Sequence, residues 1–322
     1  MKDFDVTALG ELLIDFTENG ISEQGNPLLE ANPGGAPCNV LAMLSKLGRK
    51  TAFIGKVGND IFGRQLRQAI LEEGIDTAYL QMDDKTHTTL AFVQKKPNGD
   101  RDFSFYRDPG ADMMLEPEEI HEDIFQRTRI FHFGSLSMTH PSNRQATRKA
   151  LQFARKNGCL ISFDPNLREP LWDSLEHARE QIAYGMGFCD VLKISDNELQ
   201  WFSGKDDFDE GIAILKNHYH IPLILLSKGR DGSSAYYRDF RVDAEPFLQE
   251  NTIETTGAGD TFCACVLHYI LDHDIHELDR TGLRKMLTFA NAAASLITTR
   301  KGALRVMPSR EEILSLVESR AK

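Results

Sequence analysis

Short apolar runs alternate with segments of helical length along most of the chain. The first half reads as apolar VTALGELLIDF, amphipathic PCNVLAMLSKLG, apolar TAFIGKVG and amphipathic IFGRQLRQAILEEG. The second half continues with RIFHFGSLSM, SNRQATRKALQFARKNG, CLISFDPN, DVLKIS and IPLILLSKG. This alternation predicts βαβ units and a mainly parallel sheet. Because the strands are almost continuously apolar, we expect an α/β fold with both faces of the sheet covered.

Two stretches depart from this alternation. Within residues 86–107, apolar and polar positions alternate from Thr88 to Gln94, a P-N-G-D turn follows, and DFSFYR alternates again, which predicts a β-hairpin. The segment LIDFTENGISEQGNPLLEANPGG predicts a second pair of short strands. Two such insertions, with strands from about 12–33 and 86–107, could form a lid over a ligand site.

The C-terminal part of the chain predicts three helices, TFCACVLHYILDH, GLRKMLTFANAAASLITT and SREEILSLVESR. The length of 322 residues fits one large α/β domain or two smaller ones. We find no internal repeat and no low-complexity linker, so we expect a single domain over residues 1–322.

Composition and charge exclude several classes of function. The 37 basic residues are outnumbered by 48 acidic ones and form no cluster, which disfavours nucleic acids and anionic membranes as partners. No apolar run has the length of a membrane span, and MKDFDVTALG is acidic rather than signal-like, so we expect a cytoplasmic protein. Five cysteines without a C-x-x-C pair predict buried, reduced thiols rather than disulfides or a zinc site.

A carboxylate stands directly behind two glycines in the run TTGAGDTFCA. The loop Gly257, Ala258 and Gly259 can offer unobstructed backbone N–H groups to an anion if a helix starts there. The run lacks the third glycine of a dinucleotide fingerprint, and the chain has neither a Walker A run nor an H-R-D catalytic loop. Asp260 could accept the proton of an alcohol during phosphoryl transfer, or it could simply cap the helix.

Three further features are compatible with a ligand site or with plain structure. NPGGAPCN places two glycines before Pro37 at a first helical position, which suits a binding loop or a turn with a cap. SKGRDGS follows an apolar strand and could be a tight turn into the next strand. Asp15 lies among apolar neighbours, where an uncompensated carboxylate is costly. We therefore expect Asp15 at the end of a strand, facing a ligand or a hydrogen-bond donor.

Together these stretches resemble the ribokinase-like, PfkB-type carbohydrate kinases, and most closely their fructokinases. The motifs that carry the resemblance are GELLIDF, PGGAPCNVLAMLSKLG and FIGKVGNDIFG near the N-terminus and ETTGAGDTFCA near the C-terminus. DFSFYRDPGADMML and FDPNLREPLW resemble the segments of fructokinases that face the sugar and the phosphate. The resemblance spans nearly the whole chain and implies a ribokinase-like three-layer α/β/α sandwich with a small β-strand lid.

The resemblance also implies the site residues. Asp260 would be the base, and the amides from Gly257 through Ala258 to Gly259 would stabilise the charge of the transferring phosphoryl group. The sugar would be bound by Asp15, Gly34, Gly35, Asn39, Phe105, Arg107, Arg168 and Asp260. ATP would be bound by Lys193, Ser227, Lys228, Gly229, Gly232, Gly259 and Asn291. From the residues alone, Phe105 could instead pack in the hairpin, Arg168 could form a surface ion pair, and Lys193 could be a solvated strand end.

The resemblance further implies ATP and Mg²⁺ as cofactors and a possible K⁺ ion. The family's N-x-x-E motif, which organises Mg²⁺ through water, falls on Ser195 to Glu198, with serine in place of asparagine. Ser195 could instead cap the helix that Glu198 continues. A K⁺ site would match Glu254, in place of the commoner aspartate, together with Thr256 and backbone carbonyls of ITTRKGA.

We therefore expect transfer of the γ-phosphoryl group of ATP to a sugar hydroxymethyl group, most simply the 6-hydroxyl of fructose. The alternatives are a kinase for 2-keto-3-deoxygluconate, ribose or a nucleoside, and a non-catalytic sugar-binding regulator, which would be expected to have lost Asp260 or the glycines. If the lid exposes an apolar face such as Leu90, Phe92 and Phe105, a homodimer built by lid-to-lid contact would cover it.

Overall fold

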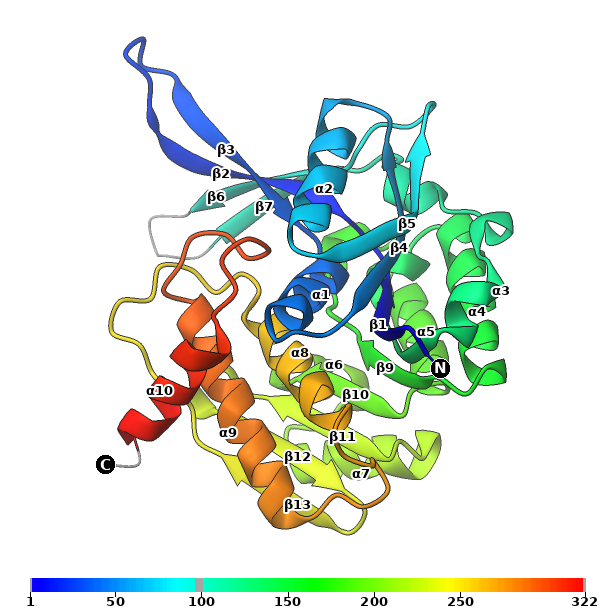
Figure 1. Cartoon of the computed structure of the whole chain (residues 1–322), viewed down its shortest axis with the longest axis vertical. Coiled ribbons are helices and arrows are strands. Elements are labelled where there is room, and N and C mark those ends of the chain that lie inside the picture. The colour runs from blue at the N-terminus through cyan, green and yellow to red at the C-terminus, as the bar shows by residue number, and fades with distance from the viewer. Residues whose placement is uncertain (1, 96–100, 321–322) are drawn as a thin grey trace.

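A nine-stranded sheet forms the centre of the molecule, which we describe from a computed structural model over residues 2–95 and 101–320 (Figure 1). The strand order is β13-β12-β11-β10-β9-β8-β1-β4-β5, and the pairs from β11 to β5 are all parallel. The strands span β1 (Phe4–Leu9), β4 (Thr51–Gly58), β5 (Ile75–Asp83), β8 (Thr128–Gly134), β9 (Leu160–Asp164), β10 (Val191–Ser195), β11 (Leu223–Ser227), β12 (Ser233–Tyr237) and β13 (Phe240–Ala244). Only β12 and β13 join the sheet antiparallel, so the predicted mainly parallel sheet is confirmed.

Helices cover both faces of this sheet. One face carries α1 (Ala36–Lys46), α2 (Ile61–Glu72), α8 (Ala258–Ile270), α9 (Arg280–Ile297) and α10 (Arg310–Arg320). The other carries α3 (Glu122–Gln126), α4 (Pro141–Lys156), α5 (Leu175–Met186), α6 (Asp196–Ser203) and α7 (Phe208–Tyr219). Alternate residues of β10 enter different cores, Leu192 and Ile194 on one side and Val191 on the other. The three-layer α/β/α sandwich is therefore confirmed.

Several of the predicted elements agree closely with the observed ones. The three C-terminal helices correspond to α8, α9 and α10, and all five cysteines are buried and free. The sequence patterns did not identify β5, α3, α5 or α7. Short 3₁₀ helices lie at Ala111–Met114, Pro117–Glu119, Ser135–Met138, Glu169–Leu171 and Gly229–Asp231. Within the described ranges, none of the helices combines the length and the apolar character that a membrane span needs.

A second, four-stranded sheet projects from the body as the lid (Figure 1). Its order is β3-β2-β6-β7, with β2 (Leu13–Ile21), β3 (Pro27–Gly34), β6 (Leu90–Lys95) and β7 (Arg101–Tyr106). Both predicted strand pairs are confirmed as antiparallel. The predicted P-N-G-D turn between β6 and β7 lies outside the described residues.

The pattern predicts that the apolar run VTALGELLIDF is one strand, but in the structure it forms parts of two. It contributes β1 to the central sheet and β2 to the lid, with a break at residues 10–12. At the break Gly10 packs so closely on α1 that an added Cβ would lie 2.5 Å from Cγ of Pro37. The predicted position of Asp15 at a strand end is therefore wrong, because Asp15 is the third residue of β2.

Candidate active site

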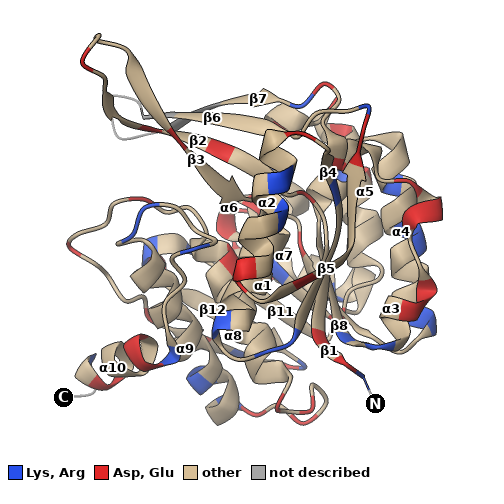
Figure 2. Ribbon diagram, turned by 45° about the horizontal axis from the view of Figure 1, so that its top comes forward, with Lys and Arg blue, Asp and Glu red and all other residues tan. Residues whose placement is uncertain are grey.

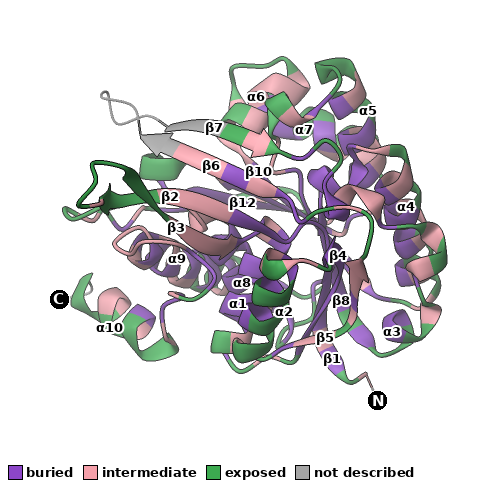
Figure 3. Cartoon of the chain, turned by 90° about the horizontal axis from the view of Figure 1, so that it is seen from above, coloured by how far each residue is buried: buried purple, intermediate pink, exposed green. Residues whose placement is uncertain are grey.

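A cavity of about 900 Å³ lies between the lid and the body. The lid contributes residues from β2, β3, β6 and β7, and the body contributes residues that follow β9, lie within β10 and precede α8. Carboxyl ends of parallel strands form one edge of a sheet, where ligands commonly bind in α/β proteins. The cavity is lined by Asp15, Asn39, Phe105, Arg168, Lys193, Glu254, Thr256, Gly257, Gly259 and Asp260, among others. Figure 3 views the molecule from above, with the lid strands over the central sheet.

Helix α8 presents Asp260 to this cavity from its first turn. The N-cap residue is Gly257, with φ of 78°, where a Cβ would also lie 2.8 Å from Cβ of Ala303. A glycine is therefore required both for the backbone conformation and for space. Asp260 is the third residue of the helix and is 8% exposed. The alternative in which Asp260 merely caps α8 is wrong, because the N-cap residue of α8 is Gly257.

The carboxylate of Asp260 is held by Asn39 of α1. The Nδ2 atom of Asn39 donates a hydrogen bond of 2.8 Å to Oδ2 of Asp260. Burial raises the pKa of Asp260, and the Asn39 hydrogen bond and the charges of Lys193 and Arg168 oppose that rise. The Oδ1 atom of Asn39 is buried and has no hydrogen-bond partner among the described residues. Since Asn39 lines the cavity, this acceptor suits a ligand hydroxyl group.

Lys193 supplies a buried positive charge beside the glycine loop. Its Nζ lies 3.0 Å from Oδ2 of Asp164, and both side chains are buried. A Cβ added to Gly259 would lie 3.1 Å from the same Nζ atom. Burial lowers the pKa of Lys193, but the carboxylates of Asp164 and Glu198 outweigh this and raise it. Lys193 therefore remains charged, and it is not the solvated strand end that its sequence also allowed.

Asp15 lines the cavity on its lid side. Burial raises the pKa of Asp15 to about 7, although the Arg168 charge acts in the opposite direction. A Cβ at Gly34 would collide with Oδ2 of Asp15, and one at Gly35, where φ is +124°, would collide with the backbone of Glu11. The two glycines therefore let β3 and the start of α1 approach the Asp15 carboxylate closely.

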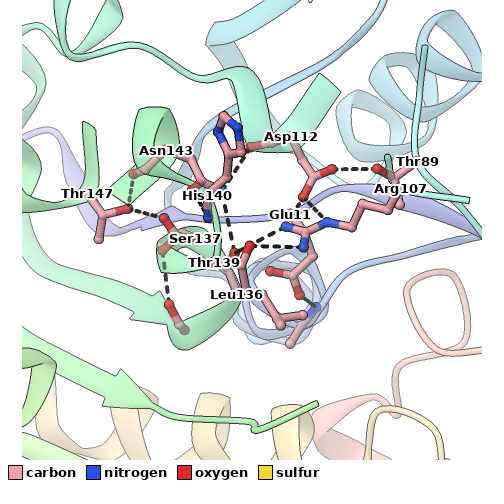
Figure 4. Close-up of polar contacts among 12 residues, drawn as sticks. Glu11, Thr89, Arg107, Asp112, Leu136, Ser137, Thr139, His140, Asn143 and Thr147 are labelled. Carbon is pink, nitrogen blue, oxygen red and sulfur yellow. Dashed lines mark hydrogen bonds and ion pairs between the residues drawn. The ribbon is translucent and has the colours of Figure 1, made fainter. Parts of the chain in front are cut away.

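Phe105 lines the cavity, whereas Arg107 is buried and is not among the lining residues. Figure 4 shows the polar contacts of Arg107 with Asp112, Thr139 and Leu136. The guanidinium group of Arg107 pairs with Asp112 at 2.6 Å and donates to Oγ1 of Thr139 and to the carbonyl of Leu136. Thr89, next to β6, donates to the other oxygen of Asp112 at 2.5 Å. These contacts tie the root of the lid to the body, and the sugar contact of Arg107 stays a prediction.

Arg168 lines the cavity, and among the described residues its side chain donates a hydrogen bond only to a neighbour in the chain. Its Nη1 atom donates to the carbonyl of Leu167 at 3.1 Å, and no ion pair involves its guanidinium within the described ranges. The charge of Arg168 lowers the pKa values of both Asp15 and Asp260 against the effect of burial. The surface ion pair that its sequence allowed is therefore not formed.

The motif that replaces N-x-x-E forms a capping box at the start of α6. Oγ of Ser195 accepts from the N–H of Glu198, whose Oε2 accepts from the N–H of Ser195 at 2.8 Å. The other carboxylate oxygen accepts from the N–H of Leu167 at 2.7 Å and keeps a second lone pair. The predicted cap by Ser195 is confirmed. Among the described residues no three His, Cys, Asp or Glu side chains form a metal cage. A carboxylate oxygen with a free lone pair suits water-mediated contact with Mg²⁺.

Glu254 and Thr256 both line the cavity in the segment before α8. Oε1 of Glu254 accepts from the N–H of Gly302 at 2.8 Å. This bond brings the predicted K⁺ ligands next to the segment ITTRKGA, which contains Gly302. The donor set is made of oxygen atoms, which hard cations prefer.

The remaining predicted nucleotide residues lie outside the cavity, along the β11–β12 connection. Ser227 is the last residue of β11 and is in register with Ser195 at the end of β10, and Lys228, Gly229 and Gly232 follow it. The predicted tight turn in SKGRDGS is confirmed, because a 3₁₀ helix over residues 229–231 leads into β12.

Asn291 holds the backbone after β13. Its Nδ2 donates to the carbonyls of Ala244 and Glu245, and its Oδ1 accepts from Oγ of Ser233. These bonds use both amide hydrogens of Asn291. The side chain therefore holds α9 against the start of β12 and the end of β13 instead of presenting a donor to solvent.

Three residues of the site were not identified from the sequence. Glu11 lines the cavity, accepts from the N–H of Ala36 at 2.9 Å and has a pKa raised by burial to about 7. Asp164 forms the ion pair with Lys193, and burial raises the pKa of Asp164 to about 6. Asn166, with φ of 44°, also lines the cavity. Glu11 carries the same signal that identified Asp15, a carboxylate in an apolar stretch.

The chain is similar to known proteins along nearly its whole length. The family model "pfkB family carbohydrate kinase" matches residues 3–310. "Probable fructokinase-2" of Arabidopsis thaliana is 40% identical over 316 residues, covering 97% of this chain and 95% of that protein. The structure of fructokinase with bound ATP from Xylella fastidiosa is similar with a TM-score of 0.90 at 29% identity, covering 100% of both chains. A Vibrio cholerae O395 fructokinase double mutant, bound to fructose, ADP and potassium ion, is similar with a TM-score of 0.87 at 27% identity, covering 98% of this chain and 99% of that one.

Proposed function

Because the chain belongs to the pfkB family of carbohydrate kinases, we propose that it is an ATP-dependent fructokinase that forms fructose 6-phosphate. The similarity to fructokinases over 97% of the chain supports fructose as the acceptor. The observation that carries the reaction is the position of Asp260, which is buried at the amino end of α8 and oriented by Asn39 within the cavity.

In the proposed reaction the 6-hydroxyl of fructose attacks the γ-phosphorus of ATP. The new P–O bond forms as the bond to the β-phosphate oxygen breaks, ADP leaves, and Asp260 takes the hydroxyl proton. A free aspartate has a pKa of about 3.9, so the proton moves only as the hydroxyl oxygen bonds to phosphorus. Burial raises the pKa of Asp260 and so makes it a stronger base than a free aspartate.

Electrostatic stabilisation comes from two groups at the same end of α8. The N–H groups of Gly257, Ala258 and Gly259 belong to the N-cap and first turn of the helix, where unsatisfied donors and the dipole favour an anion. Lys193 adds a charge beside Gly259. We propose that these groups contact the γ-phosphoryl group, while Asp15, Asn39 and the backbone at Gly34 and Gly35 hold the sugar.

Phe105 and Arg168 complete the proposed binding site from opposite sides. Phe105 covers the sugar from the lid, and Arg168 balances the charges of Asp15 and Asp260 and contacts the transferring phosphate. Closure of this cavity by the lid would exclude water and limit wasteful hydrolysis of ATP. ATP would extend from Lys193 along the edge formed by the ends of β10 and β11, towards the connection over residues 227–232.

We assign the proposed cations to oxygen groups on the rim of the cavity. Mg²⁺ would be held by the phosphates of ATP and reach Glu198 through water, and it would neutralise charge on those phosphates. K⁺ would be held by Glu254, Thr256 and backbone carbonyls near Gly302. Both assignments concern residues whose oxygen atoms lie in or next to the cavity.

The direct test replaces Asp260 and measures both catalysis and binding. We expect Asp260→Asn and Asp260→Ala to lower kcat by about 10²-fold to 10⁴-fold, the usual contribution of a general base, with fructose and ATP still bound. The matched control is Asp206→Asn, an exposed aspartate between α6 and α7. Near-normal turnover of Asp260→Ala with folded protein would remove Asp260 from this role.

A panel of acceptors tests the sugar. Fructose, 2-keto-3-deoxygluconate, ribose and a nucleoside are compared with ATP by ADP release and by the product's phosphate position. The proposal requires the highest kcat/KM for fructose, with the phosphate on O6. Efficient turnover of another acceptor without turnover of fructose would contradict the assigned substrate and leave the kinase family unchanged.

We also propose a homodimer through the lid and a cytoplasmic location. Phe105 does not belong to the apolar lid face that we expected from Leu90, Phe92 and Phe105. It pairs with Ala91, so its side chain lies on the cavity side of the lid, opposite to Leu90 and Phe92. The outer face instead combines Phe92 with the stacked Phe16 and with Tyr106, which is 67% exposed. Large exposed apolar surface favours association.

Sedimentation at several protein concentrations tests the dimer. Tyr106→Asp would place a charge on the outer face and should shift the protein to monomers, whereas Tyr219→Asp on α7 serves as a control away from the lid. A monomeric wild-type protein would contradict the dimer. The five buried, reduced cysteines are consistent with the proposed cytoplasmic location.

A further inference from the structure

A second cavity, of about 670 Å³, opens between α8, α9 and α10. It shares no lining residue with the active-site cavity. Its volume lies within the range of about 300–1,000 Å³ that is usual for small-molecule sites. The proposed kinase reaction uses none of its side chains, so its composition needs a separate explanation.

The inner surface of this cavity is apolar and aromatic. Cys265 and Met286 are buried between α8 and α9 and form its base, and Leu314 and Val317 of α10 close one side. His268 and Phe289 also line it, with their rings stacked at a centroid distance of 6.4 Å. An apolar ligand body could therefore bury its surface on three helices at once.

The rim of the same cavity is basic. Its charged lining residues are Arg280, Arg284, Lys285 and Arg310, and the lining contains no Asp or Glu. Arg280 donates to the carbonyl of Arg241, but the side chains of Arg284, Lys285 and Arg310 make no ion pair or hydrogen bond in the described part of the chain. Figure 2 shows basic segments on α9 and near the start of α10.

Three carboxylates at or near the ends of these helices are engaged with other groups, and Glu311 and Glu318 of α10 do not line the cavity. Asp272 pairs with Arg49 at 2.5 Å, and Asp279 accepts from the N–H of Gly282 as the N-cap of α9. Glu312 pairs with Arg300. Burial, together with the charge of Arg49 and a smaller effect of Arg310, lowers the pKa of His268 to about 4. In a protein of net charge −11, a cavity rim with four basic residues and no acidic one is a local site of positive charge.

We propose that the cavity between α8, α9 and α10 binds a small amphiphilic anion, with an apolar body against Met286 and Phe289 and a carboxylate or phosphate head on the basic rim. An arginine fork matches either head group, and charge-assisted hydrogen bonds are stronger than neutral ones. An apolar interior explains the body of this ligand and three unpaired cations explain its head. This binding is independent of the proposed phosphoryl transfer.

Calorimetry on the full chain tests the proposal with three eight-carbon probes, octanoate, octyl phosphate and octanol. We expect one equivalent of octanoate or octyl phosphate to bind at least about tenfold more tightly than octanol, and the tighter of the two identifies the head group. The Arg284→Gln, Lys285→Gln, Arg310→Gln triple variant should lose this preference. Val317→Trp, which fills the cavity from α10, should lose binding of all three probes.

A matched triple variant, Lys46→Gln, Arg67→Gln and Lys85→Gln, removes the same charge from exposed sites outside the cavity and should bind like the wild type. Thermal unfolding and kinase turnover confirm that each variant is folded. Equal affinity for octanol and the anions, equal losses in both triple variants, or no binding at about 10 mM anion would overturn the proposal. Self-association that the rim variant abolishes would overturn it in favour of a contact between copies of the chain.

Discussion

Asn39 and Asp260, 221 residues apart in the chain, are joined by a hydrogen bond of 2.8 Å inside the cavity. The bond connects the start of α1, fixed by the glycines before it, to the start of α8, fixed by Gly257. One Asn39 atom holds the proposed base, and its other polar atom has no partner among the described residues. The side chain can therefore orient Asp260 and a sugar hydroxyl group at the same time.

Replacing Asn39 should alter the pH profile as well as the rate. The Asn39 hydrogen bond opposes the burial that raises the pKa of Asp260. Asn39→Leu removes that bond, and Asn39→Asp adds a like charge, so both should move the acidic limb of the kcat/KM profile to higher pH, by about one unit or more for Asn39→Asp. We expect KM for fructose to rise with kcat lower. An unchanged acidic limb would exclude this coupling, and Asn157→Leu at the end of α4 is the control.

The buried pair of Lys193 and Asp164 allows stability to be separated from catalysis. Lys193→Met leaves a buried carboxylate without its partner, which should cost about 3–5 kcal/mol of unfolding free energy. In Lys193→Met with Asp164→Leu both charges are gone, and most of that loss should be recovered. If Lys193 stabilises the transferring phosphoryl group, kcat stays low in both variants. Recovery of kcat together with stability would show a purely structural role.

The sequence predicts the layers of this fold because periodicity reports burial directly. Strands such as β10 and β11 are apolar on both faces, and α8 and α9 carry broad apolar surfaces. The boundary between β1 and β2 could not be predicted in this way. VTALGELLIDF is apolar throughout, and the break at Gly10 follows from its close contact with Pro37, a residue of another element.

The site was predictable where the chemistry lies in short runs and less so where it depends on contacts between distant segments. Glycine placement next to a helix start singled out Gly257 to Asp260 and Gly34 to Asn39, with a plain cap or turn as the alternative for each run. The ion pair of Asp164 with Lys193 joins the end of β9 to the middle of β10, and that of Arg107 with Asp112 is set by the path of the chain after β7. Local spacing contains no information about which side chain a charged group will meet.

Gly34 should tolerate no side chain if the Asp15 carboxylate binds the sugar. A Cβ there would collide with Oδ2 of Asp15, and it must displace that carboxylate from its position in the cavity. We expect Gly34→Ala to raise KM for fructose by about tenfold or more, equivalent to at least about 1.4 kcal/mol, with KM for ATP nearly unchanged. Gly187→Ala is the matched control, since Gly187 has φ of −66° and ordinary contact distances. Equal effects on both substrates would argue against a specific role for Gly34.

Asp15 should make the ligand-free protein less stable as pH rises. Burial raises its pKa to about 7 in the folded state, against about 3.9 for a free aspartate. Between these values the folded state binds more protons than the unfolded state, so unfolding free energy falls with increasing pH. Asp15→Asn avoids this loss and should be more stable than the wild type by about 2 kcal/mol at about pH 8, roughly half of what the full shift implies because the cavity admits water. The difference should vanish near pH 4.

Urea unfolding at several pH values measures this difference, and two other acids give it a sign control. Glu11→Gln should behave like Asp15→Asn, because burial also raises the pKa of Glu11 to about 7. Glu198→Gln should have the opposite sign. Burial acts to raise the pKa of Glu198, but Lys193 and backbone donors outweigh it and lower the pKa, so this carboxylate stabilises the fold above its unfolded pKa and loses that effect in acid. If Asp15→Asn were less stable than the wild type at about pH 8, the Asp15 carboxylate would be a stabilising group and not one retained at a cost for binding sugar.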